Sequence, residues 1–171
     1  MKFEVTARWV FAGLGLIPLA LLAEGLILQH FQGVAPCPLC VLQREAFFLF
    51  ALIAFSGAIH KPRRRGAALY AGGMALAALA GLGVAIWNVW TLHHPKFGCG
   101  IDLMEQFVNN LPTAKLLPWM FRAYGECSAR FEPILGLVVS EWALAWFATL
   151  FLSAAFLVYK YLSAVPTRAE S

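Results

Sequence analysis

Four long runs of apolar residues divide the chain, at positions 9–28, 41–59, 67–90 and 142–162. Each run is 19 to 24 residues long, and about 20 residues of helix cross a hydrocarbon core roughly 30 Å thick. Because a lone helix satisfies its own backbone hydrogen bonds in lipid, the runs predict transmembrane helices. A barrel would instead show alternating segments of about ten residues. The pattern therefore predicts an all-α, integral membrane four-helix transmembrane bundle in which residues 1–171 form a single domain.

Composition supports a membrane protein over a soluble one. Of the 171 residues, 61% are hydrophobic and 13% are charged, whereas a soluble domain is nearer half apolar and a quarter charged. The 14% aromatic content argues against disorder. The first run contains Pro18 and Glu24, but apolar residues resume at Leu26, which favours a span over a short signal peptide.

The basic residues predict the orientation of the bundle. Loop 60–66 carries four basic residues and no acidic one, whereas loop 30–40 has no Lys or Arg and loop 91–141 has four against five acidic residues. The positive-inside rule then puts loop 60–66 and both termini, residues 1–8 and 163–171, in the cytoplasm. The net charge of +4 is thus a topology signal, and we expect no nucleic-acid partner.

The segment 91–141 is the largest part of the chain outside the spans. Four prolines interrupt it, so we expect a loop with short helices. Its apolar cluster, residues 116–121, is flanked by Lys115 and Arg122. Two interpretations stay open, a cap packed on the bundle or a short helix lying in the membrane surface.

All four cysteines fall on the predicted non-cytoplasmic side, where disulfides persist. Cys37 and Cys40 form a C-x-x-C motif just before the second span, and a disulfide in so tight a loop restrains little chain. A thiol at a helix N-terminus has its thiolate favoured, so this pair is predicted to be a reactive dithiol. For Cys99 and Cys127 a structural disulfide remains open.

Zinc is a further alternative for the cysteines. A C-x-x-C pair with two more cysteines can bind the metal, and His93 or His94 could substitute as ligands. The spacing of the second cysteine pair does not follow the usual zinc pattern, so we expect no metal site.

Arg44 follows Cys40 by four positions and Cys37 by seven, which places all three on one face of a helix. Arg44 either snorkels to lipid phosphate or faces a polar ligand beside the dithiol. A dithiol that cycles also needs an electron acceptor, and the chain has no dinucleotide or haem-attachment motif. A lipid-soluble quinone fits, because it reaches the mouth of the span from the bilayer and accepts two electrons. Arg44 would stabilise negative charge developing on a quinone oxygen.

Several motifs occur in a fixed order along nearly the whole chain. They are Cys37-Pro-Leu-Cys40 followed by Gln43-Arg44, Cys99-Gly-Ile-Asp102, Leu116-Leu117-Pro118, Gly125-Glu126-Cys127, and Leu135-Gly136-Leu137 ahead of Trp142. In this order they resemble the disulfide bond formation protein B (DsbB) family of bacterial inner membranes. The resemblance implies a multi-pass inner-membrane protein with loops 30–40 and 91–141 in the periplasm.

The resemblance also implies roles for the four cysteines. The pair Cys99/Cys127 would exchange with a periplasmic thiol oxidase, a DsbA-like partner. The pair Cys37/Cys40 would then take the electrons and pass them to ubiquinone or menaquinone. The chain would be a thiol:quinone oxidoreductase that supports disulfide bond formation.

Two further positions are implied to contact the quinone. Arg44 falls on the arginine that the family uses for this purpose. The family often has a histidine near the end of the third span, where this chain has Asn88, which could still donate a hydrogen bond.

Two other functions remain as alternatives. A reductase resembling vitamin K epoxide reductase would also combine C-x-x-C with loop cysteines, but its C-x-x-C usually lies at the last span, whereas here it precedes the second. A non-enzymatic membrane scaffold with two structural disulfides would need no electron acceptor. The role of Glu24, inside the first span, has no explanation from the sequence.

Overall fold

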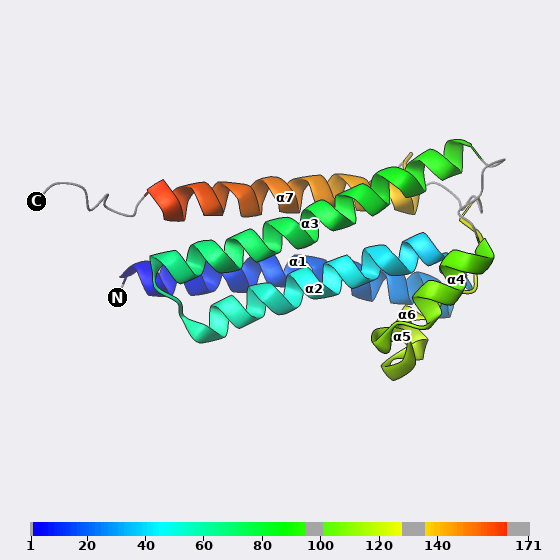
Figure 1. Ribbon diagram of the computed structural model, residues 1–171, viewed down its shortest axis with the longest axis horizontal. Coiled ribbons are helices and arrows are strands. Elements are labelled where there is room, and N and C mark those ends of the chain that lie inside the picture. Colours follow the sequence, from blue (N-terminus) through cyan, green and yellow to red (C-terminus); the bar gives the residue numbers. More distant parts are fainter. Residues whose placement is uncertain (1, 95–100, 128–135, 164–171) are drawn as a thin grey trace, which may run out of the picture.

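The computed structural model describes residues 2–94, 101–127 and 136–163, and it describes side chains from residue 7 on and, after the first gap, from residue 103 on. Four long helices, α1 (Lys2–Phe31), α2 (Pro38–His60), α3 (Arg64–His93) and α7 (Val139–Ser163), lie side by side (Figure 1). Three short helices, α4 (Ile101–Asn109), α5 (Pro112–Leu116) and α6 (Pro118–Phe121), gather at the end of the bundle where α2 begins.

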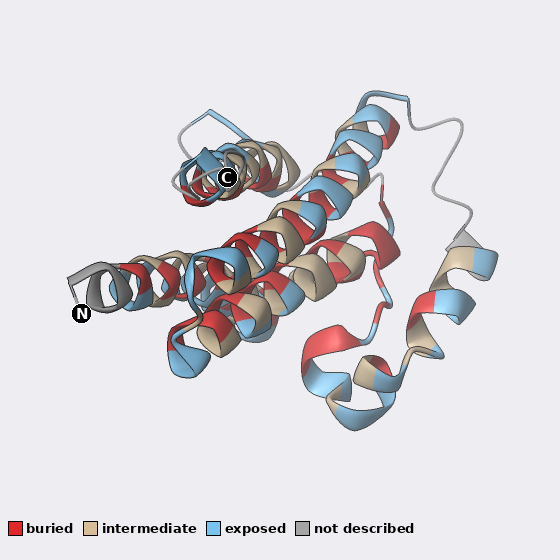
Figure 2. Cartoon of the chain, turned by 60° about the vertical axis from the view of Figure 1, so that its left-hand side comes forward, coloured by how far each residue is buried: buried red, intermediate tan, exposed pale blue. Residues whose placement is uncertain are grey.

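The all-α prediction is confirmed for the described residues. Within them, four helices are long and apolar enough to cross a membrane, Ala7–Phe31, Pro38–His60, Arg64–His93 and Val139–Ser163. Each of the four predicted apolar runs lies inside one of these helices. Figure 2 shows burial alternating along the long helices, and outward leucines such as Leu69 and Leu76 are exposed, as a lipid-facing surface requires.

The boundaries of α2 follow from its sequence. Pro38 occupies the first turn, where its missing N–H costs nothing. Cys37 has an extended backbone and caps the helix, because its Sγ accepts a hydrogen bond from the Cys40 N–H at 3.1 Å. The helix ends at His60, and Lys61 adopts a left-handed conformation at φ 48° before Pro62 prevents continuation.

Aromatic contacts hold the long helices together. Phe47 of α2 stacks on Phe147 of α7 with ring centroids 3.9 Å apart. The Phe147 ring lies against Gly81 of α3, where a Cβ would overlap it. Phe11 of α1 is fully buried between Tyr70 and Tyr161. These rings join all four spans, so the glycine on α3 is needed for the close approach of α7.

The short helices dock on the first half of α2. Phe121 is fully buried and meets Phe48 edge to face, and the Thr113 hydroxyl donates to the Glu45 carboxylate. The Asn109 side chain closes this segment on itself by two bonds, donating to the Ala123 carbonyl at 3.0 Å and accepting from the Ala123 N–H at 2.8 Å. The apolar cluster therefore packs as a cap.

The same cluster also has an outward side. Leu116 is 79% exposed and Trp119 is 53% exposed, while Met120 beside them is buried. This two-sided arrangement is what a helix at a membrane surface would have, so the second interpretation stays a prediction.

Candidate functional site

The dithiol motif forms a disulfide at the start of α2. Cys37 and Cys40 are bonded to each other, with their Cα atoms 5.0 Å apart. Cys37 is 3% exposed, whereas Cys40 is partly accessible. The first N–H groups of a helix lack intrahelical partners and carry partial positive charge, so a thiolate formed here is stabilised. This position of the pair favours thiol–disulfide exchange.

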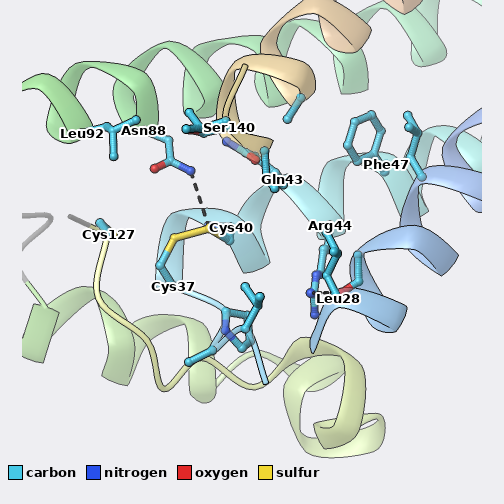
Figure 3. A pocket seen from close by; sticks show the side chains of 18 of the residues that line it. Leu28, Cys37, Cys40, Gln43, Arg44, Phe47, Asn88, Leu92, Cys127 and Ser140 are labelled. Atoms are coloured by element: carbon cyan, nitrogen blue, oxygen red, sulfur yellow. Dashed lines mark hydrogen bonds between the residues drawn. A yellow bond between two sulfur atoms is a disulfide. The ribbon is translucent and has the colours of Figure 1, made fainter. Parts of the chain in front are cut away.

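A returning loop segment brings Cys127 to this pair. The backbone N–H groups of Tyr124 and Gly125 both donate to the Pro36 carbonyl, at 3.1 and 3.0 Å. A Cβ on Gly125 would overlap the backbone of Ala35, so only glycine permits this approach. Cys127 is buried in one cluster with Cys37 and Leu39, and Figure 3 shows it near the Cys37–Cys40 disulfide. Cys127 is itself disulfide-bonded.

Five of the six predicted site residues belong to the described part of the chain, and one does not. Cys99 lies outside the described residues. The other five predicted residues, Cys37, Cys40, Arg44, Asn88 and Cys127, line one cavity.

This cavity has a volume of about 120 Å³ and lies where α1, α2, α3 and the start of α7 converge. Its walls are mainly apolar, with Leu28, Phe47 and Ala143 among them. A second cavity of about 300 Å³ shares these three residues and is also lined by Glu24 and Trp142. Glu24 therefore lies in the wall of a cavity between α1 and α7, which the sequence alone did not indicate.

Asn88 reaches the dithiol from α3. It is 3% exposed, and its Nδ2 donates to the Cys40 Sγ at 3.6 Å (Figure 3). A donor at this sulfur favours the thiolate over the thiol. His93 and His94 are exposed, and their rings lie against carbonyls of their own helix. They do not line the cavity.

Arg44 makes three hydrogen bonds to protein acceptors. Its NH1 donates to the Gln29 Oε1 at 2.5 Å and to the Met120 carbonyl at 2.9 Å, and its NH2 donates to the Gly25 carbonyl at 3.0 Å. A guanidinium has five N–H groups, so two remain outside these bonds within the described part of the chain. Arg44 thus joins α1, α2 and the end of α6 while it borders the cavity.

Gln43 is a cavity residue to which the sequence assigned no role beyond its place in a motif. It is 6% exposed, and its Nε2 is the one fully buried side-chain nitrogen or oxygen among the described residues that has no hydrogen-bond partner. It follows Cys40 by three positions, a spacing that puts two residues on neighbouring turns of one helix face. From that spacing the sequence could have predicted that Gln43 lies beside Cys40.

Two observations bear on metal binding. Cys37 and Cys40 are joined as a disulfide. Among the residues that the structure describes, no three His, Cys, Asp or Glu side chains gather in a group that could hold a metal ion. The polar groups that line the cavity are amides, a guanidinium, the Ser140 hydroxyl and the Glu126 carboxylate, beside the disulfide.

Comparison with known proteins identifies what the chain is similar to. Residues 7–157 match the family model described as disulfide bond formation protein DsbB. The chain is 47% identical over 143 residues to Disulfide bond formation protein B of Herminiimonas arsenicoxydans, covering 82% of this chain and 88% of that protein. It is 46% identical over 134 residues to Disulfide bond formation protein B 1 of Pseudomonas fluorescens, covering 78% and 79%. It is 40% identical over 152 residues to the Cupriavidus necator protein, covering 89% and 92%.

Proposed function

Because the chain belongs to the disulfide bond formation protein B family, we propose that it reoxidises a periplasmic DsbA-like thiol oxidase and passes the electrons to a membrane quinone. Family membership makes it an oxidoreductase of disulfide bond formation, and its four apolar helices fit a multi-pass membrane protein. The proposal places it in the bacterial inner membrane with both termini in the cytoplasm. The observation that carries it is a C-x-x-C disulfide bordering a mainly apolar cavity at one end of the bundle.

The first steps are thiol–disulfide exchanges. A thiolate of the reduced partner attacks the Cys99/Cys127 disulfide, and a mixed disulfide forms and resolves, so one S–S bond breaks for each that forms. The reduced loop pair then attacks the Cys37–Cys40 disulfide in the same way. The packing of Cys127 against Cys37 supports this second exchange, because it puts one cysteine of the loop in the buried cluster against which Cys40 also packs.

The last step needs an acceptor in the cavity. A quinone head group is an apolar ring with two carbonyls, and the cavity offers apolar walls with Asn88 and Arg44 as donors. When bound, ubiquinone or menaquinone accepts the two electrons and two protons that the Cys37/Cys40 dithiol loses as its S–S bond forms again. Asn88 holds the sulfur of Cys40, and Arg44 keeps two N–H groups for a carbonyl oxygen.

The test is reoxidation in vesicles. The purified protein is placed in vesicles that contain ubiquinone, menaquinone or no quinone, and a reduced periplasmic thiol oxidase is added outside. We expect the partner to be oxidised only with quinone, with one quinol formed for each disulfide. Equal rates with and without quinone would refute the proposed acceptor, and no oxidation under any condition would refute the activity.

A further inference from the structure

The amide of Gln43 poses a physical problem that the proposed relay does not use. A buried N–H without an acceptor costs free energy, and buried side-chain amides in folded proteins are nearly always bonded. In the described part of the chain, every other fully buried side-chain nitrogen or oxygen has a partner. Gln43 is therefore an exception in need of an acceptor.

The cavity that Gln43 lines offers a place for an acceptor. Gln43 is one of the residues that line it, and Figure 3 shows Gln43 toward Ser140 of α7, whereas Arg44 lies toward Leu28 of α1. The cavity volume of about 120 Å³ is several times the roughly 10–15 Å³ that a cavity needs to hold one water. Gln43 thus borders a space that can hold a ligand group beside its amide.

The other donors at the site are already partly used. The Asn88 Nδ2 donates to the Cys40 sulfur. Three N–H groups of Arg44 donate to Gln29, Gly25 and Met120. Gln43 is the donor group whose nitrogen has no bond to the described chain. Ser140 and Glu126 also line the cavity, but most of its wall is apolar, so a single carbonyl on an otherwise apolar ring is an acceptor that suits it.

We propose that Gln43 is a quinone-binding residue, whose Nε2 donates a hydrogen bond to one carbonyl of the quinone on the α7 side of Cys40. This inference rests on the proposed function, because it requires a quinone in the cavity. The two carbonyls of the quinone then have different donors. Gln43 donates to one of them, and the other faces Arg44. Because Gln43 follows Cys40 by one helical turn, the bond also fixes the ring beside the reactive sulfur.

The experiment compares the wild type with Gln43→Met, which keeps the side-chain length and removes the amide. Ubiquinone carrying a ¹³C label in one carbonyl at a time is bound, and the carbonyl stretch is measured by infrared difference spectroscopy. A hydrogen bond lowers this frequency, so we expect one carbonyl to be lowered in the wild type and released in the variant. The quinone KM should rise about two- to tenfold, as expected for one neutral hydrogen bond, with a smaller change in kcat.

Thermal unfolding provides a second measurement. Without quinone, Gln43→Met should be at least as stable as the wild type, because it removes an unbonded amide from an apolar site. Added quinone should raise the midpoint less in the variant than in the wild type. Thr149→Val, a polar-to-apolar change on the exposed face of α7 away from both cavities, serves as the matched control and should behave as the wild type.

The outcomes separate the inference from the proposed function. If the wild type neither binds nor reduces quinone, the proposed function fails. If it does both and Gln43→Met keeps the same carbonyl bands and KM, the amide bonds only water and the inference alone is overturned. If Gln43→Met does not fold, Gln43→Asn replaces it, because this variant shortens the side chain by one methylene. Gln43→Asn must release the same carbonyl from its hydrogen bond. An unchanged carbonyl band in Gln43→Asn would also overturn the inference.

Discussion

Gly125→Ala tests how the loop cysteine reaches the dithiol. An added Cβ would lie 2.7 Å from the carbonyl carbon of Ala35 and still closer to its oxygen. Both are backbone atoms, so no side chain can rotate away, and one of the two segments must move. The two N–H bonds to the Pro36 carbonyl depend on the same approach.

The magnitude follows from these contacts. Overpacking costs about 1–3 kcal/mol, and each weakened backbone hydrogen bond costs about 0.5–1.5 kcal/mol. Together these terms come to about 2–6 kcal/mol, and even the lower end reduces the docked population of the segment about 30-fold relative to undocked forms. We therefore expect electron transfer from Cys127 to the Cys37/Cys40 pair to slow by about tenfold or more.

The assay separates this step from quinone chemistry. Quinone absorbance is followed after adding either the reduced protein partner or a small dithiol that can reach the partly accessible Cys40 directly. Gly125→Ala should slow the first reaction and spare the second. Gly83→Ala adds the same methyl group where nothing lies within 4 Å, and is the matched control. Wild-type rates with the protein partner in Gly125→Ala would refute the idea that this close approach positions Cys127.

Three further predictions concern single residues. Arg44→Ala should lose about tenfold to a hundredfold in kcat/KM for quinone, the scale of one hydrogen bond from a charged donor, while Arg44→Lys should chiefly raise KM; wild-type quinone kinetics in Arg44→Ala would contradict its role. Cys40→Ser should abolish quinone reduction yet still allow a mixed disulfide with the partner, which non-reducing electrophoresis would detect; retained turnover would remove Cys40 from the relay. Gly81→Ala should lower the free energy of unfolding by about 1–3 kcal/mol because its Cβ overlaps the Phe147 ring, whereas Gly72→Ala, in open space, should not; equal midpoints would exclude the steric effect.

The spans could be predicted because their signal is local. An apolar run long enough to cross a bilayer fixes a helix whatever surrounds it, so each predicted run lies inside a long helix. The C-x-x-C motif at a helix start is equally local, since Cys37 caps a helix that Pro38 begins. Family resemblance then supplied the order of the relay, which no single motif contains.

The surroundings of Arg44 and Gln43 could not be predicted in this way. Arg44 meets a carbonyl 76 positions later in the chain, and neither interpretation from the sequence included a bond to the cap. Whether the Gln43 amide has a partner depends on how four helices converge, because every candidate acceptor comes from another element. Periodicity places a residue on a face, but tertiary packing decides what that face meets.

The three bonds of Arg44 have a consequence for how the chain is made. Gln29 and Gly25 precede Arg44 in the sequence, so two acceptors already exist when the second span is synthesised. The Met120 carbonyl is added only 76 residues later, after the third span. During that interval the guanidinium has N–H groups that must donate to water or lipid head groups instead. Because those acceptors lie at the membrane surface, the start of α2 stays near it. The loop is therefore the last of the three partners to reach Arg44, and the early pairing of α1 with α2 prepares the place where the loop will dock.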